Sequence, residues 1–136
     1  MLTVSLKTKY GLTAMVALAK QYQSLPLQSR AIAETAQIPH NYLEQVLLEL
    51  KKSALVQSFR GSQGGYSLTK DPSSILVKDI ITCLEGPISF SSGEKPSGLL
   101  FFWQESEIAV SQVFEISLAD LLEKQRHHDQ ALSYMI

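Results

Sequence analysis

The sequence predicts a mainly α-helical fold that carries one small β-hairpin. Apolar residues recur at three- and four-residue steps through most of the 136 residues, which is the period of amphipathic helices. One segment, residues 55–68, instead places three glycines between two β-prone runs, which is typical of a hairpin. A content of 45% hydrophobic and 18% charged residues fits a globular chain with one core and an added interaction element.

The first half of the chain predicts a helix-turn-helix. A helix over about residues 8–23 ends before Pro26, and a short helix follows over residues 29–36. Gln37 marks a tight turn, where glycine would be easier if the backbone is left-handed. Pro39 opens the next helix, which runs to about residue 53 with an inner stripe of leucine and valine. Two helices of these lengths joined by so short a turn are typical of a helix-turn-helix.

The hairpin follows this pair directly. Residues 55–60 and 66–68 are the expected strands, and Gly61, Gly64 and Gly65 make a flexible tip between them. A hairpin placed after the second helix of a helix-turn-helix is a wing, so the sequence predicts a winged helix-turn-helix.

The remaining chain predicts three helices and a loop. A helix near residues 77–85 ends at Gly86, a natural cap, before Pro87. Residues 88–98 form a loop, and a long helix covers about residues 99–115. Ser117 and Asp120 form a capping signature for a last short helix over about residues 118–124, after which we expect loose order.

Charge is divided unevenly between the halves. Residues 1–70 hold eight Lys/Arg and three Asp/Glu, a net charge of +5, whereas residues 71–136 hold four and ten, a net charge of −6. A basic first half suits a polyanion, although such unevenness also arises by chance in a short chain. No apolar run reaches membrane-span length, and residues 12–19 do not predict a secretory signal. One cysteine, Cys83, excludes an intramolecular disulfide and fits a reducing cytoplasm.

Several ordered motifs give the chain a family resemblance. Over residues 5–88, and more loosely 103–122, it resembles the bacterial Rrf-two family of winged-helix transcription regulators. The motifs are Lys9-Tyr10-Gly11-Leu12, Ile38-Pro39, Tyr42-Leu43-Glu44-Gln45, Leu55-Val56, the wing Arg60–Leu68, Glu85-Gly86-Pro87 and Leu118-Ala119-Asp120-Leu121-Leu122. The resemblance implies a DNA-binding domain over residues 1–88, a loop over 89–98, and a dimerisation helix with a tail over 99–136. It also implies a homodimer that binds inverted-repeat double-stranded DNA.

The resemblance does not bring a cofactor with it. Relatives with an iron–sulfur cluster carry three cysteines in the loop after Glu-Gly-Pro, and this loop has none. Cys83 lies before Glu85 and fills no such position. We therefore expect no cofactor, and a buried structural thiol rather than a redox sensor.

The expected DNA contacts lie on the second helix of the pair and on the wing. Asn41 and Gln45 are four residues apart, and their amides suit adenine in the major groove, although both could simply be solvated. Tyr42 reaches a phosphate or packs on the first helix. The full expected set is His40, Asn41, Tyr42, Glu44, Gln45, Lys51 and Lys52 on the helix, Arg60, Gly61, Ser62, Gln63, Gly64, Gly65 and Tyr66 on the wing, and Lys7 and Lys9 for phosphates.

Five consecutive large apolar residues, 99–103, cannot all face one side of a helix. A second copy would cover them, or the first few would plug the core of the monomer. The expected dimer contacts are Leu99, Phe102, Trp103, Val110 and Phe114.

The leading hypothesis is a cytoplasmic regulator, on family grounds a repressor, with no membrane partner. The alternative is a winged-helix interaction module whose main partner is another protein, such as a metabolic enzyme. A small-molecule effector between the loop and the long helix is a third option. The sequence has no nucleophile elbow and no phosphate-binding loop, so we expect no enzymatic activity. His127, His128 and Asp129 do not predict a metal site, because the side chains of adjacent residues on a helix point in different directions.

Overall fold

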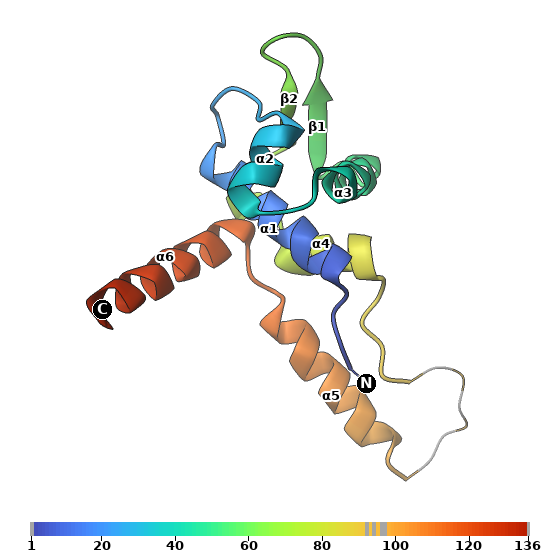
Figure 1. The fold of residues 1–136 in the computed structure, drawn as a ribbon. Coiled ribbons are helices and arrows are strands. Elements are labelled where there is room, and N and C mark those ends of the chain that lie inside the picture. The colour runs from blue at the N-terminus through green and yellow to red at the C-terminus, as the bar shows by residue number, and fades with distance from the viewer. Residues whose placement is uncertain (1, 92, 94, 96–97, 136) are drawn as a thin grey trace.

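The computed structural model describes residues 2–91, 93, 95 and 98–135. Its elements in chain order are α1 (Leu6–Lys20), α2 (Ser29–Ala36), α3 (His40–Lys52), β1 (Val56–Phe59), β2 (Gly65–Leu68), a 3-10 turn (Pro72–Ser74), α4 (Val77–Glu85), α5 (Leu100–Val113) and α6 (Leu118–Met135). Figure 1 shows α1 to α4 and the hairpin gathered into one body, from which α5 and α6 extend in different directions. The expected class, mainly α with a small hairpin, is confirmed.

One hydrophobic core lies between the first four helices. Met15, Ile32, Leu43 and Ile80, one from each helix, are all fully buried. Leu118, at the start of α6, is fully buried in the same cluster. The root of α6 is therefore packed into the body. Among the helices in the described part of the chain, none combines the length and apolarity that a membrane span requires.

The expected tight turn between α2 and α3 is present, and its backbone is left-handed at Gln37. Gln37 has φ 57° and ψ 46°, and the N–H of Ile38 donates to the carbonyl of Ala33 at 2.9 Å. This bond closes the end of α2, and Pro39 then starts α3 as its N-cap residue. A short turn of this kind fixes the angle between the two helices.

The hairpin is anchored at its root and open at its tip. β1 and β2 are antiparallel, with Val56 opposite Leu68 and Phe59 opposite Gly65. Val56 and Leu68 are buried, whereas residues 57–63 are exposed. Figure 1 shows the tip projecting beyond α2 and α3, as expected for a wing.

The C-terminal part differs from the expectation in two respects. The last helix is not short, because α6 continues to Met135, and the residues after 124 are helical rather than loosely ordered. Its start is as predicted, since Ser117 Oγ accepts from the N–H of Asp120 at 3.0 Å. Six of the eleven residues of the extension, residues 125–135, are Gln, Arg, Ala, Leu or Met, which have good helix propensity without burial.

Candidate nucleic-acid interface

Three elements meet at one end of the body, at the start of α2, the start of α3 and the wing. The hollow between them is lined by Gln28, Ser29, Arg30, His40, Phe59, Gly61, Gly64, Gly65 and Tyr66. We call this hollow, together with the exposed side chains of Asn41, Glu44 and Gln45 beside it on α3, the contact face. The sequence analysis predicted His40 and the wing residues Gly61, Gly64, Gly65 and Tyr66, but it missed Gln28, Ser29, Arg30 and Phe59. The only sequence signal of the first three was their polar character at the start of the first helix of the pair.

The wing is fastened to the body by backbone hydrogen bonds. The N–H of Tyr66 donates to the carbonyl of Leu27 at 2.7 Å, and the N–H of Leu27 donates to the carbonyl of Tyr66 at 2.9 Å. Gly65 makes this approach feasible. A Cβ there would lie 2.3 Å from the carbonyl oxygen of Leu27, and its φ of +140° disfavours any other residue.

A polar network joins α2 to α3 across the contact face. Ser29 Oγ donates to Glu44 Oε1 at 2.7 Å and lies 3.0 Å from His40 Nε2. His40 Nε2 is 3.3 Å from the same Glu44 oxygen. His40 and Glu44 can meet in this way because residues four apart share one face of a helix. The network fixes the relative placement of the two helix starts.

The first two turns of α3 carry two exposed polar side chains and one aromatic side chain that packs on α1. Asn41 and Gln45 are both exposed on one face, as their spacing predicted. Tyr42 packs on the first helix, with its ring 5.4 Å from that of Tyr10 in an edge-to-face contact. Burial, and secondly the charge of Glu44, raise the pKa of Tyr66 above its ordinary value, so its hydroxyl stays neutral beside α3.

The cations near the helix-turn-helix fall into two groups, of which only Arg30 was not predicted. Arg60 lies at the wing, and Arg30 at the contact face; both are exposed, and neither makes an ion pair with any residue the structure describes. Lys51 and Lys52 lie at the far end of α3, about 16 Å from Asn41 at 1.5 Å per residue.

Near that far end, Lys7 is paired with Glu49 at 3.3 Å, whereas Lys9 is exposed. The structure therefore does not bring Lys7, Lys51 and Lys52 into the hollow beside the wing.

The expected dimer contacts lie along an uncovered helix. α5 contains no buried residue, and its Phe102 and Trp103 are 51% and 46% exposed, with their rings 5.2 Å apart. Leu99, just before the helix, is also exposed. Val110 and Phe114 are half-buried and line a hollow with the start of the chain and Phe90. The idea that the first apolar residues plug the core is therefore wrong.

These features define the class of the protein, a winged helix-turn-helix in which the second helix of the pair and a neighbouring hairpin share one face. A family model described as "Rrf2: Iron-dependent Transcriptional regulator" matches residues 4–124. The chain belongs to this Rrf2 family of transcriptional regulators, and the resemblance stated from its motifs is confirmed.

Individual relatives agree with this assignment. The HTH-type transcriptional regulator CymR of Bacillus subtilis is 45% identical over 86 residues, which are 63% of this chain and 62% of that protein. The regulator IscR of Yersinia pestis is 34% identical over 128 residues, or 88% of this chain and 78% of that protein. The matched region thus spans less than two thirds of the length of B. subtilis CymR.

Solved structures cover more of the fold. The structure of CymR, described as the global cysteine regulator of B. subtilis, superimposes with a TM-score of 0.82 at 38% identity, over 91% of this chain and 98% of that one. T. potens IscR gives a TM-score of 0.78 at 38% identity, over 91% and 88% of the two chains.

The iron named in the family description does not fit the residues present. Loop 88–98 contains no cysteine or histidine, and no group of three or more His, Cys, Asp or Glu suited to a metal occurs among the described residues. Cys83 is half-buried rather than buried, and its thiol lies 3.1 Å from Ser53 Oγ. A single thiol on a helix cannot hold an iron–sulfur cluster, which needs several thiolate ligands.

Proposed function

We propose that this chain is a sequence-specific DNA-binding transcription regulator, which acts as a homodimer on an inverted repeat without an iron–sulfur cluster. The observation that carries the proposal is the contact face, where an exposed recognition helix, a helix start and a wing converge with two arginines that form no ion pair with any described residue. DNA supplies the anions that Arg30 and Arg60 lack.

Each part of the contact face has a distinct role in the proposal. Asn41 and Gln45 enter the major groove, where an amide donates and accepts at the same base edge. Arg60 enters the neighbouring minor groove from the wing, where negative potential is strongest if the groove is narrow. Arg30 and the backbone N–H groups at the start of α2 hold a phosphate. Ser29 keeps Glu44 and His40 aligned beside the readers.

The other predicted cations have a supporting role. Lys9, Lys51 and Lys52 approach the phosphates that flank the site and add affinity without reading sequence. Lys7 can contact a phosphate only after its ion pair with Glu49 breaks.

A second copy covers α5. Soluble proteins rarely leave large aromatic side chains clustered and exposed, and Phe102 and Trp103 form such a cluster. A two-fold dimer places the two contact faces at half-sites about 34–36 Å apart, one turn of DNA, so the site should be palindromic. Binding represses transcription if this site overlaps a promoter. Because bacterial DNA lies in the cytoplasm, a protein that binds it works in the cytoplasm.

Selection from randomised duplexes tests this function. Enriched sites are then titrated by fluorescence anisotropy with the wild type and with Gln45→Ala and Arg60→Ala. We expect an inverted repeat, and a loss of about 1–3 kcal/mol in binding free energy, roughly fivefold to 150-fold in affinity, for each variant. Absence of any enriched sequence would contradict the proposal.

One observation favours a second function, a protein-interaction module. The outer half of α6 is exposed and carries Leu132, Tyr134 and Met135, which have 47%, 91% and 82% exposure. A protein partner such as a metabolic enzyme would cover them. An apolar contact of this kind weakens little with salt, whereas phosphate contacts weaken steeply, so salt dependence separates the two functions.

A further inference from the structure

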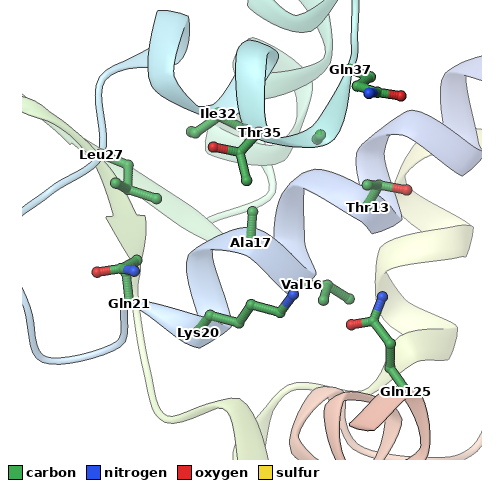
Figure 2. Close-up of a pocket in the computed structure, with 11 residues that line it drawn as sticks. Thr13, Val16, Ala17, Lys20, Gln21, Leu27, Ile32, Thr35, Gln37 and Gln125 are labelled. Carbon is green, nitrogen blue, oxygen red and sulfur yellow. The ribbon is translucent and has the colours of Figure 1, made fainter. Parts of the chain in front are cut away.

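A pocket of about 300 Å³ lies between α1, α2 and α6. Figure 2 shows its walls, with α1 beneath, α2 above and Gln125 reaching in from α6. None of its lining residues lines the hollow of the contact face. It also differs from the expected effector cavity, because loop 88–98 and α5 contribute nothing to it.

The pocket has an apolar floor and a polar rim. Val16, Ala17 and Ile32 form the floor, whereas the rim carries three glutamines and two threonines. Lys20 is the one charged residue among the 11 that line it, and no described residue forms an ion pair with it. Figure 2 shows the ammonium of Lys20 and the amide of Gln125 directed toward the same part of the pocket, beside Val16. A cation without an acid partner, next to an amide, suits a carboxylate.

We propose that this pocket binds a small monocarboxylate with a second hydrogen-bonding group, such as an amino acid or a hydroxy acid. The pocket volume is at the lower end of the range for ligand pockets, so the pocket is too small for nucleotides and other large metabolites. Lys20 and Gln125 hold the carboxylate, the floor covers the short carbon chain, and the remaining amides bind the second polar group. The ligand thereby joins α6 to the helix-turn-helix.

Two lining residues connect the pocket to the contact face. Gln37 is the left-handed residue of the turn, two positions before Pro39 leads into α3. Leu27 exchanges two backbone hydrogen bonds with Tyr66 of the wing. A ligand that contacts both residues acts on the turn and on the wing anchor at once, so its binding changes the affinity for DNA. This regulatory step rests on the proposed function, whereas ligand binding itself does not.

The first experiment measures binding without DNA. Thermal unfolding of the full chain is followed with each of the 20 amino acids and with acetate, butanoate, lactate and 3-hydroxybutanoate at 10 mM. We expect at least one compound to raise the unfolding midpoint by about 3 °C or more, as binding to the native state requires. Its Kd by calorimetry should rise at least about tenfold in Lys20→Gln, which loses a charge-assisted hydrogen bond.

Lys124→Gln is the matched control, because it removes the same charge from α6 next to Gln125 but outside the pocket. No shift with any compound, or equal affinity in Lys20→Gln and the wild type, would overturn the site. The second experiment repeats the DNA titration with the bound compound. A changed affinity that is lost in Lys20→Gln supports the coupling, and an unchanged affinity overturns it. Failure to bind any DNA would instead overturn the proposed function and leave the first experiment standing.

Discussion

Replacement of Gly65 by alanine should detach the wing from the body. A Cβ at this position would lie 2.3 Å from the carbonyl oxygen of Leu27 and 2.4 Å from its carbonyl carbon, which are backbone atoms that cannot rotate away. The chain must separate there, and the two Leu27–Tyr66 hydrogen bonds, 2.7 and 2.9 Å long, are lost or stretched.

The magnitude follows from two effects. The strained φ of +140° costs about 1–3 kcal/mol for a residue other than glycine. Loss of two backbone hydrogen bonds, at about 0.5–1.5 kcal/mol each, adds about 1–3 kcal/mol. Gly61→Ala is the matched control, because Gly61 has φ +102° but nothing within 4 Å of an added Cβ. Gly61→Ala therefore introduces the backbone strain of a positive φ without a steric clash with Leu27.

Urea unfolding at a fixed protein concentration measures the difference, since unfolding of a dimer depends on concentration. We expect Gly65→Ala to be less stable than Gly61→Ala by about 1–3 kcal/mol, with weaker binding to the selected DNA. Equal unfolding midpoints would refute the role given to the Leu27–Tyr66 bridge.

Three further changes test other parts of the structure. Gly11→Val should destabilise the fold by about 2–3 kcal/mol in urea, because even a Cβ there lies 2.1 Å from Leu84 Cδ1; wild-type stability would contradict this packing. Phe102→Ala with Trp103→Ala should weaken the dimer by about 2 kcal/mol or more, roughly thirtyfold, in sedimentation equilibrium, and an unchanged Kd would exclude α5 from the interface. Hydrogen bonds from Ser5 and Thr8 lower the pKa of Glu85 below its ordinary 4.5, so its stabilising effect is complete above pH 4.5 and is lost as pH falls through the lowered pKa. Glu85→Gln should be less stable at pH 7 and should lose less stability on acidification; parallel pH curves would contradict this.

The sequence predicted the helix-turn-helix because its signals are local. Pro39, the inner stripe of α3 and the three wing glycines each specify a turn or a face within a few residues. The inner face of α1 is harder to predict than that of α3. Because α1 is apolar on more than one side and packs on α2, α3, α4 and α6, its pattern does not single out the fully buried Met15.

The contact face could be predicted only in part. Asn41, Gln45 and Arg60 follow from helical spacing and the position of the wing. Arg30 does not, because its place beside the wing depends on the Leu27–Tyr66 bridge, which joins segments far apart in sequence. The pocket around Lys20 was missed for the same reason, since Gln125 reaches it from the opposite end of the chain. The length of α6 was underestimated because its outer half is exposed, and a pattern of apolar residues reveals only helices with a buried face.

The central claim is that the contact face binds DNA, and the salt dependence of binding tests it most directly. The affinity for a selected inverted repeat is measured from low to high salt for the wild type, Arg30→Gln and Lys124→Gln. If Arg30 neutralises one phosphate in each protomer, the slope of log affinity against log salt should fall by about 2 for the dimer in Arg30→Gln. It should stay unchanged in Lys124→Gln, whose charge lies on α6 away from the hollow. An unaltered slope in Arg30→Gln would contradict the assignment of this face to DNA.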